Sequence, residues 1–229
     1  QYLDVGIAED VAVVVSAALA LRGEKPILAI YSTFLQRGLD QVIHDISIEN
    51  LNVIFAIDRA GLVGGDGATH QGIYDMAYLR IIPNISIAMA TNVLELRSMF
   101  KAALQIDGPV ALRWPRGGTE KVPEVPFEQW PEIEWGSWEV VNPCIDSYIL
   151  GIGPTVQYGL DAVDDNPRVG VVNARFVKPL DKELLLKLAE SSKVLITVED
   201  HTVVGGLGSA VAEVLQKKGG GPRPLCLGV

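Results

Sequence analysis

Short apolar runs alternate with segments of helical spacing along the first 116 residues. The run 52–57 (NVIFAI) is apolar almost throughout and is typical of a buried strand. In 33–50, by contrast, apolar residues recur at helical spacing, and Thr33 could cap that helix. The expected strands are 26–31, 52–57, 84–90 and 109–114, and the expected helices are 9–22, 33–50, 73–80 and 92–105, the last capped by Asn92. Such alternation predicts a mostly parallel sheet with helices on both faces.

The pattern breaks after residue 116 and resumes at residue 146. The stretch 117–145 is rich in proline and contains Trp130, Trp135 and Trp138, so we expect a stiff linker whose tryptophans pack on a domain surface. Beyond it, the expected strands are 146–152, 169–173, 193–199 and 222–227, and the expected helices are 154–163, 181–191 and 205–216. The fold class is therefore α/β, with two consecutive open, mostly parallel sheets flanked by helices, in domains 1–116 and 146–229.

Composition narrows the function classes. Hydrophobic residues make up 48% of the 229, and the net charge is −9 without any block of Lys or Arg. We therefore expect no nucleic-acid partner. No apolar run is long enough to predict a membrane span, so no membrane association is expected. The chain opens without a starting Met or a charged leader, and it stops as an apolar strand finishes. We expect it to be part of a longer polypeptide.

The segment 58–72 (DRAGLVGGDGATHQG) carries the strongest candidate chemistry. It directly follows the strand expected at 52–57, and in open α/β proteins ligands sit at the carboxyl ends of strands. Its glycines allow the backbone to approach a ligand closely. Arg59, Asp66 and His70 offer an anion clamp, a hydrogen-bond acceptor and a proton carrier.

Two other motifs are weak. The triplet Gly65–Gly67 (GDG) with Asn92 matches the spacing of the metal-binding motif of thiamin diphosphate enzymes. A three-residue match is common by chance, however, and Asn92 stands where a helix needs a cap. We therefore assign neither Asp66 nor Asn92 to a metal. His201 lies at a strand-to-helix turn whose glycines could hold an anion.

Local sequence leaves several residues with two interpretations. Glu9 is either a first-turn acid favoured by the helix dipole or a catalytic carboxylate in apolar surroundings. Tyr31 and Phe34, at the end of a strand, are either core packing or a platform for a ligand. Arg59 and Arg116 either converge on a phosphate or carboxylate or form separate surface ion pairs.

Long motifs in a fixed order resemble those of the 1-deoxy-D-xylulose-5-phosphate synthase family. They are YSTFLQRGLDQVIHD, AIDRAGLVGGDGATHQG, RWPRGG, NARFVKPLD and VEDHTVVGGLGSAV, and together they span nearly the whole chain. The resemblance implies a transketolase-like transferase that joins pyruvate to D-glyceraldehyde 3-phosphate with loss of CO2. It implies thiamin diphosphate and Mg²⁺ as cofactors, a homodimer, and a role in isoprenoid precursor, thiamin and pyridoxal biosynthesis. A bacterial cytoplasm or a plastid stroma is the implied location.

The resemblance also implies which parts are present. Residues 1–116 resemble the pyrimidine-binding domain, incomplete at its start, and 146–229 resemble the C-terminal domain, incomplete at its end. The domain that binds the diphosphate and Mg²⁺ is not in this stretch, so we expect no metal ligands here and no activity from this chain alone. A β-type subunit of a split transketolase or of a 2-oxo acid dehydrogenase is an alternative, and so is a non-catalytic binding protein.

By resemblance, nine residues would form the site. Glu9 would hydrogen-bond the cofactor's pyrimidine ring, with Phe34 and Ile7 lining the same pocket. The substrate phosphate would be held by Tyr31, Arg59 and Arg116, the reacting carbons would face Asp66 and His70, and Arg37 would stand at the edge. One departure is Asp10-Val11 after Glu9, where the family usually has Gln-His.

Overall fold

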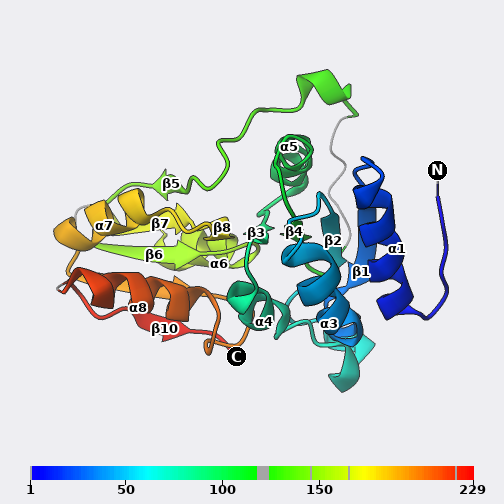
Figure 1. Cartoon of the computed structure of the whole chain (residues 1–229). Helices are drawn as coiled ribbons and strands as arrows, with labels where there is room; N and C mark the ends of the chain where they lie inside the picture. Colours follow the sequence, from blue (N-terminus) through cyan, green and yellow to red (C-terminus); the bar gives the residue numbers. More distant parts are fainter. Residues whose placement is uncertain (1, 118–123, 145, 165, 220) are drawn as a thin grey trace.

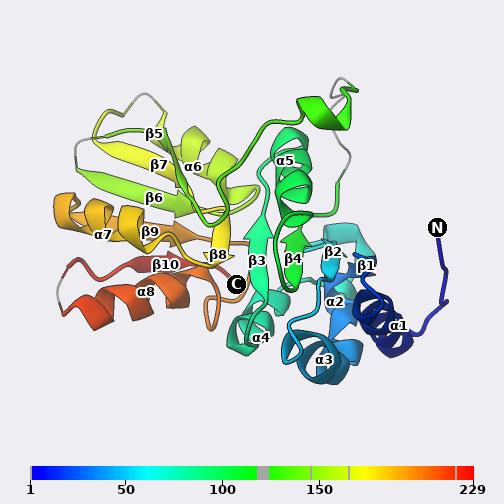
Figure 2. The same cartoon turned by 45° about the horizontal axis from the view of Figure 1, so that its top comes forward.

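Two five-stranded sheets stand side by side in the computed structural model, which describes residues 2–117, 124–144, 146–164, 166–219 and 221–229 (Figure 1). The first sheet has the order β1 (Ile27–Tyr31), β2 (Ile54–Asp58), β4 (Val110–Arg113), β3 (Ser86–Met89) and β8 (Phe176–Lys178). Its first four strands are parallel, and β8 runs antiparallel to β3. Figure 2 shows β8 lying beside β3.

The second sheet repeats this plan. Its order is β10 (Leu225–Leu227), β9 (Val194–Val198), β6 (Ser147–Gly151), β7 (Val169–Asn173) and β5 (Glu139–Asn142). All neighbours are parallel except β5, which runs antiparallel to β7. The expected fold class, two mostly parallel sheets flanked by helices, is therefore confirmed.

Helices cover the first sheet on two sides. Helix α5 lies on one face, while α3 and α4 lie on the other, and α1 stands beside edge strand β1 (Figure 1). The helical elements are α1 (Glu9–Leu21), α2 (Ser32–Leu35), a 3-10 turn (Gln36–Gly38), α3 (Leu39–Gln41), a π-helical stretch (Val42–Ser47), α4 (Asp75–Ile81) and α5 (Val93–Ala103). Two further 3-10 turns (Gly64–Asp66 and Ala68–His70) lie between β2 and α4, and another (Phe127–Gln129) precedes β5. The helix expected at 33–50 is thus four short pieces, and Gly38 among them packs closely on α1.

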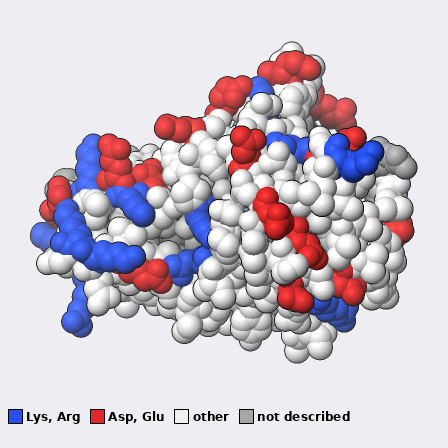
Figure 3. Space-filling model, viewed as in Figure 1, with Lys and Arg blue, Asp and Glu red and all other residues white. Residues whose placement is uncertain are grey.

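Three helices belong to the second sheet. They are α6 (Thr155–Val163), α7 (Lys182–Ser191) and α8 (Leu207–Lys218). Helix α6 packs on β6 and β7, whereas α8 packs on β9 and β10 and also contacts α7. None of the helices in the described part of the chain has the length and apolar character needed to cross a membrane. We call the first sheet with its helices the first unit, and the second sheet with α6, α7 and α8 the second unit. On the face shown in Figure 3, acidic and basic side chains are interspersed over the second unit.

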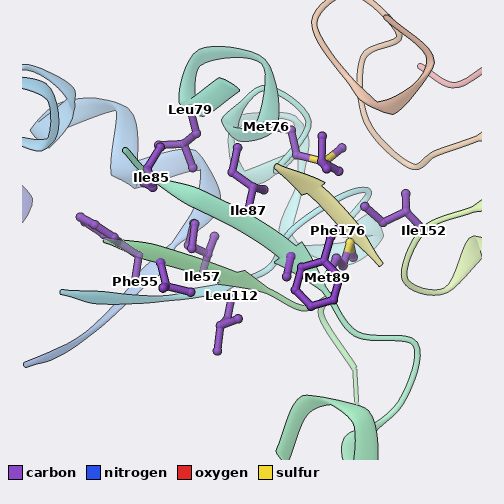
Figure 4. Close-up of a cluster of buried hydrophobic side chains, with 14 of the residues drawn as sticks. Phe55, Ile57, Met76, Leu79, Ile85, Ile87, Met89, Leu112, Ile152 and Phe176 are labelled. Carbon is purple, nitrogen blue, oxygen red and sulfur yellow. The ribbon is translucent and has the colours of Figure 1, made fainter. Parts of the chain in front are cut away.

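One hydrophobic core runs through both sheets. Met89 of β3, Phe176 of β8 and Ile152, which follows β6, are fully buried in one cluster (Figure 4). Trp138 is also buried, and its indole Nε1 donates a 2.8 Å hydrogen bond to the carbonyl of Phe176. Trp135 packs edge-on against Phe176, with 4.9 Å between ring centroids. The two sheets therefore share apolar packing that stabilises their arrangement.

Of the two helix caps expected from the sequence, one is confirmed and one is wrong, and two strands were not expected. The Asn92 cap is confirmed, because its side chain accepts a 2.9 Å hydrogen bond from the Glu95 amide. The Thr33 cap is wrong, because the Thr33 hydroxyl instead donates to the Thr69 carbonyl at 3.0 Å. Strands β5 and β8 were not expected, and β5 lies within the stretch interpreted as a linker. Residues 118–123 and 145 of that stretch lie outside the described residues.

Candidate active site

The candidate site lies where three neighbouring parallel strands end. Tyr31 closes β1, Arg59 follows β2, and Arg116 comes three residues after β4. The register places Tyr31 opposite Asp58 and Ile57 opposite Arg113, so all three chain segments emerge at the same edge of the sheet. This is the ligand-binding edge of an open α/β sheet.

Arg59 is held against an aromatic ring. Its guanidinium Cζ lies 4.1 Å from the centroid of the Tyr31 ring, and its Nη1 pairs with the carboxylate of Asp58. Residue 59 has a φ of 54°, a left-handed conformation that is uncommon for a residue with a side chain. Such strained backbone tends to gather at functional sites.

Asp66 lies between two arginines. Its Oδ1 is 2.7 Å from Arg116 Nε, and its Oδ2 is 3.5 Å from Arg59 Nε. The structure therefore brings together Tyr31, Arg59, Arg116 and Asp66, and it places Asp66 against the two arginines. Asp66 is thus the counter-ion of Arg116, and it shares Arg59 with Asp58.

The glycine loop, residues 61–72, is closed by a backbone bridge between its two ends and is stabilised by hydrogen bonds within it. Gly61 and Gly72 form an antiparallel bridge, with N–H···O distances of 2.7 and 2.8 Å. Within the loop, the Gln71 side chain accepts from the Val63 amide at 3.0 Å and donates to the Gly67 carbonyl at 2.8 Å. His70 is thereby presented toward Phe34, with its ring edge-on at 5.3 Å between centroids.

Phe34 connects this loop to Glu9. The Phe34 ring stacks at 5.9 Å on Tyr31, and the Arg37 guanidinium lies 4.8 Å from the Phe34 centroid. Arg37 Nη1 also donates a 3.0 Å hydrogen bond to Glu9 Oε1. The Glu9 side chain is 15% exposed at the start of α1. Ile7 is not part of this cluster, because it is 92% exposed.

The residues present fit one half of a thiamin-like cofactor. A carboxylate and an aromatic ring that are joined through Arg37, as Glu9 and Phe34 are, suit an aminopyrimidine ring, which needs a hydrogen-bond partner and a stacking surface. The metal half is different. The described residues contain no group of three or more His, Cys, Asp or Glu side chains able to hold a metal ion. Asp66 pairs with arginines, and Asn92 caps α5.

A buried polar cluster behind the site was not expected from the sequence. Arg113 donates to Asp75 from Nε at 2.6 Å and from Nη2 at 2.9 Å, and neither side chain has exposed surface. His201 Nε2 lies 3.7 Å from Asp75 Oδ1. One sequence signal was available: an arginine inside the apolar run PVALRW needs a buried partner, although the run does not say which.

His201 is a buried neutral acceptor. Its Nε2 accepts a 3.1 Å hydrogen bond from the Met76 amide, and its Nδ1 lies 2.9 Å from the Thr202 carbonyl, so Nδ1 carries the proton. Burial, helped by the charge of Arg113, lowers the pKa of His201 to about 4. Nearby, burial raises the pKa of Glu199 to about 7, although its carboxylate accepts from the Leu207 and Gly208 amides of α8.

Comparison with known proteins places both halves of the chain. Residues 1–121 match the family described as transketolase, pyrimidine binding domain, and residues 136–226 match transketolase, C-terminal domain. All 229 residues align at 59% identity with 36% of the 1-deoxy-D-xylulose-5-phosphate synthase of Thermus thermophilus. The enzyme of the same name from Aquifex aeolicus is 47% identical, with 37% of its length covered. The chain thus spans little more than a third of these curated relatives.

A solved structure gives a different kind of match. The chain superposes in full on 75% of a protein described as a split gene transketolase, inactive beta4 tetramer, with a TM-score of 0.88 and 33% identity. Both the shared fold and the shared sequence therefore extend across the two sheets.

Proposed function

We propose a function from one premise: this chain belongs to the transketolase family, whose pyrimidine-binding and C-terminal domains it matches. Within that family, the chain supplies part of a synthase that condenses pyruvate with D-glyceraldehyde 3-phosphate to 1-deoxy-D-xylulose 5-phosphate, releasing CO2. The observation that carries this proposal is the convergence of Arg59, Arg116 and Tyr31 beside Phe34 and Glu9. The 59% identity to a synthase of that name supports it.

The acceptor's phosphate is assigned to the two arginines. A phosphate entering between Arg59 and Arg116 would replace Asp66 as their counter-ion, and it would gain charge-assisted hydrogen bonds from both. Tyr31 fixes the Arg59 guanidinium from below by its ring face. Asp66, released from this pairing, and His70 then face the reacting carbons, with His70 as a proton donor or an orienting group.

The pyrimidine of thiamin diphosphate is assigned to Glu9 and Phe34, and Ile7, which is 92% exposed, would line this pocket only when the rest of the protein covers it. Glu9 would hold a proton shared with the ring, and Phe34 would stack on it. Arg37, bonded to Glu9 and lying over Phe34, would fix both side chains at the edge of the site. When bound, the cofactor supplies the electron sink that lets pyruvate lose CO2. Asp10-Val11 follows Glu9 where the family usually has Gln-His.

The rest of the protein would complete the site. We propose that the diphosphate and Mg²⁺ are held by a further domain, that residues 117–145 link the two units described here, and that the assembled protein is a homodimer. Helix α1 supports the last point. Val11, Val14 and Leu21 are exposed on the side of α1 opposite its buried residues, so they form an apolar stripe. A bacterial cytoplasm or a plastid stroma remains the proposed location.

A split enzyme is the second candidate. The match to a split gene transketolase covers this whole chain, and that relative is described as inactive as a β-type tetramer. In this case a separate partner chain would bring the diphosphate and Mg²⁺ site. The lower identity, 33% against 59%, places this candidate second.

Turnover measurements test both candidates. We expect the longer protein containing these residues to form 1-deoxy-D-xylulose 5-phosphate from pyruvate and D-glyceraldehyde 3-phosphate, and the 229-residue chain alone to form none. Arg59→Ala and Arg116→Ala should raise KM for the phosphorylated acceptor, while Arg168→Ala, at an exposed ion pair of the second unit, should not. Native mass spectrometry of the purified protein distinguishes one long chain from a complex of two. A long chain that binds thiamin diphosphate and makes no product would instead support a non-catalytic binding protein.

A further inference from the structure

The glycine loop is held at both of its ends by consecutive residues of the second unit. The segment Glu199–Thr202 follows β9, and the views in Figures 1 and 2 show the chain between β9 and α8 lying beside α4. Helix α4 begins directly after the loop that carries Asp66 and His70. The two units therefore meet at the proposed substrate site.

At the first end of the loop, Asp200 packs against Gly61. A methyl group on residue 61 would overlap the Asp200 carboxylate, so the close approach requires glycine there. Gly61 also has a φ of 85°, which favours glycine independently. Because Gly61 is bridged to Gly72, contact with Asp200 fixes both strands at the base of the loop.

At the second end, two hydrogen bonds cross between the units. The Thr202 amide donates to the Ile73 carbonyl at 3.1 Å, and the Met76 amide donates to His201 Nε2 at 3.1 Å. Met76 lies in the first turn of α4, where backbone amides lack partners within the helix. Thus His201 satisfies a donor that would otherwise be buried and unpaired.

The segment Glu199–Thr202, which contacts both ends of the loop, is itself held by hydrogen bonds to α8. The Glu199 carboxylate accepts hydrogen bonds of 2.8 Å from the amides of Leu207 and Gly208, which tie it to the start of α8. Arg113 lies close enough to act electrostatically on Glu199, Asp200 and His201, and its own guanidinium is locked on Asp75. Movement of this segment would therefore disrupt several buried contacts at once.

We propose that Asp200–Thr202 is a positioning segment that sets where Asp66 and His70 stand relative to the substrate, an inference that rests on the proposed function. Asp200 and His201 act through the loop and not on the reacting atoms. Glu9 and Phe34 lie outside the loop, so the segment acts on the acceptor side directly and reaches the pyrimidine side through loop contacts such as that between His70 and Phe34.

The test uses the full-length protein with four variants. Asp200→Ala removes the contact with Gly61, and His201→Leu removes the acceptor for the Met76 amide. His201→Gln is the conservative partner, because the glutamine carbonyl can replace Nε2 as an acceptor. Glu213→Gln is the matched control, since it breaks only the exposed ion pair with Arg80 across the same boundary between the units.

Two readouts are compared. In Asp200→Ala and His201→Leu, hydrogen–deuterium exchange of residues 61–73 should accelerate by about tenfold or more. In the same variants kcat should fall by about tenfold to a hundredfold, with a raised KM for D-glyceraldehyde 3-phosphate and a smaller change in affinity for thiamin diphosphate. His201→Gln should restore most of the turnover, and Glu213→Gln should match the wild type.

Each outcome decides a separate point. If Asp200→Ala and His201→Leu both fold and the hydrogen–deuterium exchange of residues 61–73 is unchanged, the segment Asp200–Thr202 does not hold the loop. Faster exchange with unchanged turnover would overturn its role in positioning, as would an equal loss in His201→Gln and His201→Leu. If the wild type forms no product but exchange of residues 61–73 rises in the variants, the proposed function fails, whereas the claim that Asp200–Thr202 holds the loop is supported. Should His201→Leu not fold, Asp200→Ala alone decides between these results.

Discussion

The guanidinium of Arg113 and the carboxylate of Asp75 share two hydrogen bonds, of 2.6 and 2.9 Å, with no exposed surface on either side chain. Arg113→Met would leave the Asp75 charge buried without its partner. We expect it to lower the free energy of unfolding by about 3–5 kcal/mol in urea titrations. The double variant Arg113→Met with Asp75→Leu should recover much of this loss, because neither charge remains. A double variant as unstable as the single one would contradict this account.

Replacing Asp66 should make Arg59 and Arg116 more available to bind phosphate. In Asp66→Asn, Arg116 loses its carboxylate partner while Arg59 retains Asp58, so inorganic phosphate should bind more tightly than to the wild type, by roughly threefold or more. Isothermal titration with phosphate measures this directly and does not depend on turnover. Arg116→Gln should weaken the same binding. Equal phosphate affinity in the wild type and Asp66→Asn would show that the arginines do not form the phosphate site.

The Tyr31 ring, not its hydroxyl, should matter for holding Arg59. Tyr31→Phe keeps the face on which the guanidinium lies, so KM for the phosphorylated acceptor should stay close to that of the wild type. Tyr31→Ala removes the ring and should raise this KM by roughly threefold or more. If Tyr31→Phe were as impaired as Tyr31→Ala, the hydroxyl would have to contact substrate directly.

The two shifted pKa values predict opposite effects of pH on stability. Glu199 has a folded pKa of about 7, above its ordinary 4.5, so the folded state binds the extra proton and its stabilising effect is lost as pH rises from 4.5 to 7. His201 has a folded pKa of about 4, below its ordinary 6.5, so its effect is lost as pH falls from 6.5 to 4. Asp200, whose pKa burial also raises, acts in the same sense as Glu199.

Comparing variants separates these contributions. The stability advantage of the wild type over His201→Gln should grow between pH 4 and 6.5, and its advantage over Glu199→Gln should shrink between pH 4.5 and 7. Urea midpoints measured across pH 4–8 test both trends. A pH-independent difference for either variant would mean that the residue does not titrate differently in the folded and unfolded states.

The apolar stripe on α1 should be an assembly surface. Leu21→Asp places a charge on this exposed stripe, so it should reduce association in the full-length protein while leaving thermal stability of the monomer nearly unchanged. Tyr158→Asp, at an exposed apolar residue of α6, is the matched control. Sedimentation velocity distinguishes the species. Unaltered association in Leu21→Asp would place the interface elsewhere.

Much of the architecture could be predicted from the sequence because the strands of both sheets are apolar runs separated by helical spacing. The site edge followed from the same reasoning, since parallel strands bring their carboxyl ends together, and eight of the nine expected site residues lie in one connected cluster. Ile7 is the exception. Its side chain is 92% exposed and lies outside the cluster.

What could not be predicted depends on tertiary contacts. Strands β5 and β8 are edge strands of four and three residues, too short for a periodic signal. The pairing of Arg113 with Asp75, and of His201 with the Met76 amide, joins residues 38 and 125 positions apart. No local pattern identifies such partners. The sequence analysis placed His201 only at a turn whose glycines could hold an anion, and it did not single out Arg113.

Strand β8 has a consequence for how the chain can be divided. It belongs to the C-terminal half by sequence, yet it covers the outer edge of β3 in the first sheet. A truncation that ends in the stretch 124–144 would leave β3 with uncovered backbone groups, and such edges invite pairing between molecules. The excised first half should therefore aggregate, and the two units should unfold together in a single transition.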